Sequence, residues 1–193
     1  PGGSAKVTDV TLMGDKIVSV GKVTHQKCLR IDGTGHVLSP GFIETQSSLG
    51  LVEVSLEDTS VDTSLTAKDS SPVPVRATFR VFEAYNPSSS LIPIARRHGV
   101  TSSILLPKGG TISGQAAWVD LRGQTQAEAV RSEAVAMIAH IGQSCASRAT
   151  SLHRLRTLFE EAQAFEGASK DWKKNKSRPF AHVRELRALR LVL

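Results

Sequence analysis

The chain has 193 residues, of which 40% are hydrophobic, and its 24 basic and 18 acidic side chains give a formal net charge of +6. This composition is ordinary for a globular protein and allows one full core or two small ones. No run of about 18 apolar residues is present, which excludes a membrane-spanning helix, and no basic and then apolar leader opens the chain. We therefore expect a soluble protein of the cytoplasm or the periplasm.

The first 40 residues predict short strands. Residues 6–12 and 17–21 alternate roughly with period two and flank Gly14-Asp15, which is typical of a β-hairpin. Asp32-Gly33-Thr34-Gly35 is a second turn signal, and residues 36–38 predict a further strand.

A strand, a helix and a second strand are predicted next. Residues 42–49 form the first strand, and residues 55–75, rich in Ser, Thr, Asp and Pro, form a long loop. A helix is expected from residue 86 to residue 99, because Pro lies near its start and Gly at its end. Residues 100–106 then end in the continuous apolar run of a buried parallel strand. Helix and strand together make half of a βαβ unit.

The last third of the chain is predicted to be mainly helical. A glycine-rich connector and a strand over 115–121 precede a helical pattern from Gln126 onward. Apolar residues recur at spacings of three and four from Leu152 to Phe165, with Thr150 or Ser151 as the expected N-cap. Pro179 is expected to open a last helix.

Much of the excess positive charge lies after residue 169. A basic stripe can bind nucleic acid or an anionic membrane, but no helix-turn-helix or RNA-binding motif accompanies this one, and it has few aromatic residues. We expect a solvated helix face, with neither nucleic acid nor membrane as a partner. Cys28 and Cys145 lie far apart, which argues against a disulfide scaffold and a zinc ribbon.

The segment Asp32 to Glu44, with Pro40-Gly41-Phe42-Ile43-Glu44 at its end, resembles the entry to the barrel of the amidohydrolase superfamily. Other segments resemble the subgroup related to imidazolonepropionase; these are residues 84–87, 95–101, 112–117, 178–180 and 185–189. The resemblance implies an α/β fold in which a small β-sandwich segment, residues 1–39, precedes the N-terminal part of a TIM-like (β/α)8 barrel, residues 40–193. Because such a barrel takes about 250 residues, we expect several barrel strands to be missing from this chain.

The metal-binding motif of that superfamily is replaced here. Its first barrel strand carries His-x-His, and the matching positions of this chain are Gln46 and Ser48. Residues two apart on a strand share one face, so we expect both side chains to line a pocket, but their oxygens are weak ligands for zinc-type ions. Family members use zinc or a similar divalent metal, and their remaining ligands come from later strands. None of the six histidines makes a metal-binding pattern, so no metal and no cofactor is predicted for this chain.

Three further residues are candidates for the pocket. Glu53 lies within an apolar run beside the acidic residues Glu57, Asp58 and Asp62. This cluster is either an acid–base pair or a polar loop, and the loop is the favoured interpretation. Ser113 and Gln115 follow the glycines 109 and 110, which predict a turn rather than a phosphate cradle, and a barrel presents such loops on its catalytic face.

The resemblance implies a hydrolase that acts on non-peptide carbon–nitrogen bonds of amides or cyclic amides. Because this chain has neither the histidine pair nor the later ligands, we expect it to be inactive alone. The alternative is a non-catalytic binding or scaffold protein on the same fold, which also takes a small amide-type ligand. The sequence gives no indication of the oligomeric state.

Overall fold

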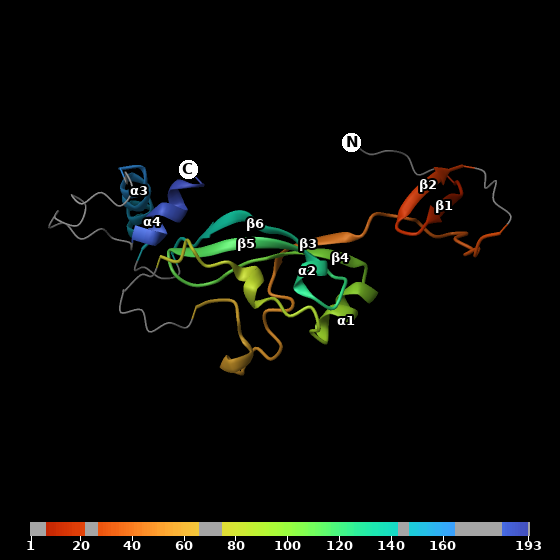
Figure 1. Ribbon diagram of the computed structural model, residues 1–193, viewed down its shortest axis with the longest axis horizontal. Helices are drawn as coiled ribbons and strands as arrows, with labels where there is room; N and C mark the ends of the chain where they lie inside the picture. The colour runs from red at the N-terminus through yellow and green to blue at the C-terminus, as the bar shows by residue number, and fades with distance from the viewer. Residues whose placement is uncertain (1–6, 22–26, 66–74, 143–146, 165–182, 193) are drawn as a thin grey trace. The chain divides into compact units, whose positions relative to one another are not determined.

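A computed structural model describes residues 7–21, 27–65, 75–142, 147–164 and 183–192. The chain divides into two compact units, residues 1–40 and residues 41–193. Figure 1 shows the ribbon, in which a two-stranded sheet belongs to the first unit and a four-stranded sheet with its helices to the second.

The first unit contains the predicted hairpin. Strands β1 (Val10–Met13) and β2 (Lys16–Val20) pair antiparallel around a turn in which Gly14 has a φ of 62°. The second predicted turn is also present, because the backbone N–H and the hydroxyl of Thr34 both donate to Asp32 Oδ1, at 2.9 and 2.7 Å. The strand predicted over 36–38 was wrong: these residues are irregular, and no ladder partner among the described residues pairs with them.

The second unit is built on a mixed sheet with the strand order β3-β4-β5-β6. Strand β3 (Phe42–Ser47) runs parallel to β4 (Val100–Leu105), and α1 (Leu91–Arg97) lies between them in sequence, so the predicted helix-to-strand unit is confirmed. Strands β5 (Ile112–Asp120) and β6 (Val130–Ala139) then continue antiparallel. The α/β class is therefore correct, but the described sheet is an open mixed sheet and not a closed barrel.

Helix α1 is shorter than the predicted helix over 86–99. The physical reason is Pro93, which lacks an N–H and therefore fits a helix only within its first turn. A helix from residue 86 would place Pro93 in its interior, whereas a start at Leu91 places it third. Residues 86–89 form a turn instead, with Ser89 N–H donating to the Asn86 carbonyl at 3.2 Å.

The helix predicted from Gln126 onward was mostly wrong. Helix α2 covers only Gln126–Ala129, where Thr125 and Glu128 form a capping box, and the chain then enters β6. The segment is rich in Ala, which favours helices, but pairing with β5 outweighs this weak preference. An ion pair between Arg80 and Glu133 also holds β6.

The main core lies on one face of β4 and β5. Leu105 pairs with Ala117 and Ser103 with Val119, so these residues share a face, and Tyr85 packs in the same cluster. The other members of the cluster are buried as well: Leu51, Val81, Ile92, Leu121 and Ala129. This cluster fixes α1 and the loop after β3 to the sheet, and it thereby positions the candidate site.

Two helices form a second cluster with the start of β5. Helices α3 (Arg148–Ala164) and α4 (Val183–Arg190) lie side by side near one end of the sheet in Figure 1. Helix α3 begins before the predicted caps Thr150 and Ser151, because the Ser147 hydroxyl accepts from the Thr150 N–H at 3.2 Å. Pro179 and the basic residues 170–178 lie outside the described residues.

In the described part of the chain, we find no helix with the length and apolar character needed to cross a membrane.

Candidate functional site

An open pocket of about 490 Å³ lies beside the carboxyl end of β3. Gln46, Ser47 and Ser48 all line it, together with Glu44 on the same strand. Three consecutive residues of a regular strand would alternate between faces. Here β3 advances from residue 44 to residue 47 while β4 advances only from 103 to 105, which is a β-bulge. The bulge explains why neighbouring side chains border one pocket.

Glu44 stabilises the bulge. Its Oε1 accepts a hydrogen bond from the Gln46 backbone N–H at 3.0 Å. Gln46 itself is exposed and Ser48 is half-buried, and both border the pocket.

A tight turn after β3 returns the chain to the pocket. The Ser48 carbonyl accepts from the N–H groups of Leu51 and Val52, at 2.9 and 3.1 Å. Gly50, with a φ of 74°, packs against the ring of Tyr85, where a Cβ atom would lie 2.5 Å from the ring. The residue must therefore be glycine for conformational and steric reasons. This turn brings Glu53 to the pocket wall.

Glu53 is held by the segment that precedes α1. Its Oε2 accepts from the hydroxyl of Ser89 at 3.0 Å, and its Oε1 accepts from Asn86 Nδ2 at 3.2 Å. Ser89 is only 2% exposed, so its hydroxyl gives Glu53 a fixed donor. The neighbouring acidic residues Glu57 and Asp58 are exposed and do not line the pocket. Among the predicted pocket residues, the structure thus brings Gln46, Ser48 and Glu53 together.

Ser113 and Gln115 lie elsewhere, within β5, and not on a loop. Ser113 is fully buried, and Gln115 donates from Nε2 to the Ala77 carbonyl at 2.9 Å. Neither lines the pocket beside β3. The strand begins three residues earlier than the predicted 115–121, so Ser113 lies in the sheet with Gln115.

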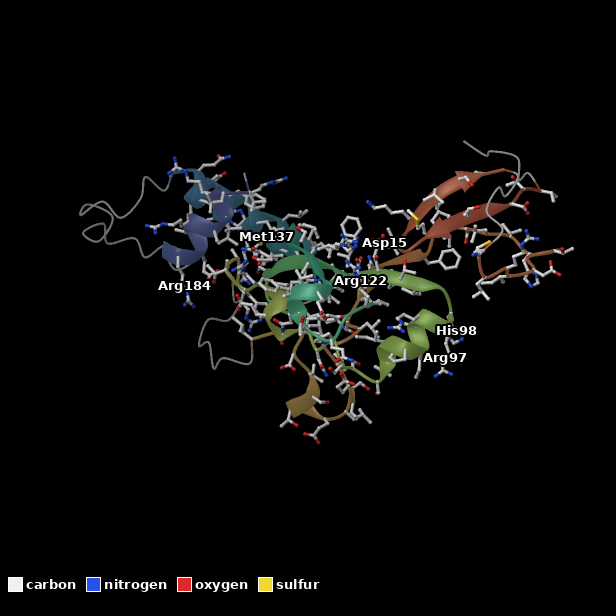
Figure 2. The ribbon with its side chains drawn as sticks, turned by 45° about the vertical axis from the view of Figure 1, so that its right-hand side comes forward. Asp15, Arg97, His98, Arg122, Met137 and Arg184 are labelled. Carbon is white, nitrogen blue, oxygen red and sulfur yellow. The ribbon has the colours of Figure 1, made fainter. Side chains whose placement is uncertain are left out.

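A second hollow of about 640 Å³ lies beside α2. Its lining includes Arg122, which Figure 2 labels, and Glu128. The Glu128 carboxylate accepts from the N–H groups of Gln124 and Thr125, at 2.8 and 3.3 Å, and these bonds lower the pKa of Glu128. Because this acid is already engaged in capping α2, we do not favour the hollow as a site.

The polar group around Asp120 was not predicted from the sequence. Its carboxylate accepts from Ser102 Oγ at 2.9 Å and from Arg131 Nε at 2.6 Å. Arg122 Nε lies 3.3 Å from Asp120 Oδ2. Burial raises the pKa of the Tyr85 hydroxyl to about 12, and the charge of Asp120 adds to this shift. Ser102, Tyr85 and Arg131 come from elements other than that of Asp120, so no sequence spacing could have linked them to it.

The residues around the pocket do not fit a zinc-type ion. Zinc prefers imidazole and thiolate ligands, and the pocket lining contains neither. Across the described ranges, no group of three or more His, Cys, Asp or Glu side chains could hold a metal ion. Glu44 and Glu53 supply carboxylates, but the other polar lining groups are neutral hydroxyl and amide groups, which are weak ligands for such ions.

Comparison with known proteins supports the fold. No family model matches the chain, and a search of curated proteins found no match. The solved structure of an amidohydrolase from Thermotoga maritima superposes with a TM-score of 0.74 at 20% sequence identity. The match covers 95% of this chain and 50% of that protein, so this chain spans half the length of its structural neighbour. The chain therefore has an amidohydrolase-like fold over nearly all of its length.

Proposed function

We propose that this chain is the N-terminal part of an amidohydrolase-like (β/α)8 barrel, related to the imidazolonepropionase subgroup, and that the pocket beside β3 binds a small amide-type ligand. The class of reaction proposed for the complete fold is hydrolysis of non-peptide carbon–nitrogen bonds. For the chain itself, we propose binding without hydrolysis, as in a non-catalytic binding or scaffold protein.

The observation that carries this proposal is the position and chemistry of the pocket. Ligands of α/β folds bind beyond the carboxyl ends of parallel strands, and the pocket lies at that end of β3. Its polar lining suits an amide: a carboxylate such as Glu53 accepts from an amide N–H, and the hydroxyl of Ser48 donates to an amide carbonyl. No imidazole is present in the lining to hold a metal that would activate water.

The proposal is tested with two cyclic amides, dihydrouracil and hydantoin, as probes. Saturation-transfer NMR measures their binding to the unmodified chain, and chromatography measures ring opening. The variant Gln46→Trp fills the pocket from an exposed position, and Ala127→Trp is the matched control in the hollow beside α2. We expect binding that Gln46→Trp abolishes and Ala127→Trp retains, with no ring opening.

Two results would contradict the proposal. Binding that survives Gln46→Trp, or no binding of either probe, would remove the pocket as the ligand site. Ring opening by the unmodified chain would instead show that it is a hydrolase, and Glu53 would then be the first residue to test as its acid or base.

A further inference from the structure

Helix α4 carries a buried carboxylate in its first turn. Glu185 is 3% exposed, although Arg184 and Arg187 beside it on the helix are exposed to solvent. Arg184 is labelled in Figure 2, and its side chain is 75% exposed. A carboxylate is rarely buried to this extent unless hydrogen bonds compensate for its lost hydration.

Thr78 supplies that compensation from a segment 107 positions earlier in the chain. Its backbone N–H donates to Glu185 Oε2 at 2.8 Å, and its hydroxyl donates to Oε1, also at 2.8 Å. Arg184 Nε adds a bond to Oε1 at 3.1 Å. Both oxygens of the carboxylate are therefore occupied, and the two bonds to one residue fix its orientation.

The Thr78 N–H is available because its segment makes a turn. The segment 75–80 is bridged to β5 at its two ends, and between them the Phe79 N–H donates to the Arg76 carbonyl at 3.0 Å. Thr78 lies in the middle of this turn, so its N–H takes no part in the hydrogen bond that closes the turn. Glu185 accepts from this N–H and so gives it a partner.

The same contact places α4 over an apolar cluster. Leu186 and Leu189 of α4 are buried against residues from α3, from β5 and from the segment 75–80, namely Ala77, Ile112, Leu155, Leu158 and Ala162. Apolar contacts alone would tolerate more than one position of a short helix. A buried carboxylate that must meet Thr78, its partner outside α4, selects one of these positions.

We propose that Glu185 is a latch: its bonds to Thr78 hold α4 in one register over the start of β5, and their loss releases α4 while the sheet remains folded. Release uncovers the apolar surfaces of Ile112 and Leu158. Helix α4 is then a covering element whose position depends on Glu185 and Thr78.

Hydrogen exchange followed by mass spectrometry tests the latch on the whole chain. Glu185→Ala removes both bonds to Thr78 and the bond from Arg184, and Glu160→Ala, at an exposed position of α3, is the matched control. Hydrogen bonds to charged groups are strong enough that we expect Glu185→Ala to speed exchange of the α4 amides at least about tenfold. Exchange in β4 should remain unchanged, and Glu160→Ala should change neither element.

The variant Thr78→Val keeps the backbone bond and loses only the hydroxyl bond. We expect it to speed exchange in α4 by a smaller factor, and the double variant to match Glu185→Ala alone, because one interaction is removed in both. If Glu185→Ala does not fold, the rate of hydrogen exchange of α4 in Thr78→Val alone decides whether the latch exists. Unchanged α4 exchange, or exchange that rises equally in β4, would overturn the latch. So would an α4 that exchanges like an unfolded peptide in the unmodified chain.

Discussion

The two units contain similar strand patterns but bury them very differently. In the hairpin, Leu12 of β1 and Ile17 of β2 are 62% and 65% exposed. In the sheet of the second unit, Leu105 of β4 and Val119 of β5 are fully buried. An alternating apolar pattern therefore predicts a strand, but it does not tell whether anything covers that strand. A two-stranded hairpin is a single layer that cannot cover its own apolar face. Strands β4 and β5, by contrast, are covered by α1 and the loops around it.

The largest expected difference between the units comes from truncating one leucine in each. We expect Leu105→Ala to lower the free energy of unfolding of the second unit by about 2–5 kcal/mol, because it leaves a cavity in the core. Leu12→Ala removes a mostly exposed side chain, so we expect a loss under about 0.5 kcal/mol. Urea unfolding measures the first, and hydrogen exchange of β1 and β2 measures the second. Equal losses would mean that the hairpin is covered as well as the sheet.

Two glycines with positive φ give a second matched pair. Gly14 and Gly50 have φ values of 62° and 74°, so an alanine at either costs about 1–2 kcal/mol of backbone strain. A Cβ at Gly14 would meet no atom of the described residues within 4 Å, whereas at Gly50 it would lie 2.5 Å from the Tyr85 ring. We therefore expect Gly50→Ala to cost a further 1–3 kcal/mol, roughly, for overpacking. If urea unfolding shows similar losses of unfolding free energy in Gly14→Ala and Gly50→Ala, the contact between Gly50 and Tyr85 is contradicted.

Tyr85, the single tyrosine of the chain, lies in the buried core of the second unit, so its titration reports on that burial. Its pKa is raised to about 12, mainly by burial, so the folded state keeps a proton that the unfolded state releases near pH 10. This contribution to stability is complete below pH 10 and is lost as the pH rises through 12. Tyrosinate absorbance should show a midpoint near 12 in the folded chain and near 10 in denaturant.

Two variants serve as checks on that titration. Asp120→Asn should lower the pKa of Tyr85 but leave it above its ordinary value, because burial is the larger cause. Tyr85→Phe should remove the loss of stability in this pH range. A folded midpoint near 10 would show that water reaches the hydroxyl.

The smallest effect is expected for two serines. The hydroxyl of Ser103 in β4 is buried and has no hydrogen-bond partner among the described residues, whereas Ser19 of β2 is exposed. Deleting an unsatisfied buried hydroxyl removes a desolvation cost, so we expect Ser103→Ala to be neutral or to stabilise by up to about 1 kcal/mol. Ser19→Ala should change nothing measurable. A clear loss of stability in Ser103→Ala, seen by urea unfolding, would show that the hydroxyl has a partner such as bound water.

Several features could be predicted from sequence because their causes are local. The β1–β2 hairpin follows from alternation around Gly14, and the β3-α1-β4 unit follows from apolar runs separated by a helix. Even the shorter start of α1 was encoded locally, because Pro93 alone restricts it.

Other features depended on contacts between distant residues. The segment that became β6 has the composition of a helix, and only its pairing with β5 decided otherwise. The bulge in β3 set which side chains border the pocket, and strand alternation alone could not predict it. The bonds from Ser89 to Glu53 and from Thr78 to Glu185 join positions that sequence spacing does not connect.

The sequence by itself therefore determined the hairpin and the first parallel strand pair, since these depend on residue type and short-range spacing. Only the tertiary structure decided that Glu53 lies with Gln46 and Ser48 at one pocket and that Ser113 and Gln115 do not. The physical reason is that a pocket is formed where separate elements pack together, and packing depends on long-range burial that no local pattern contains.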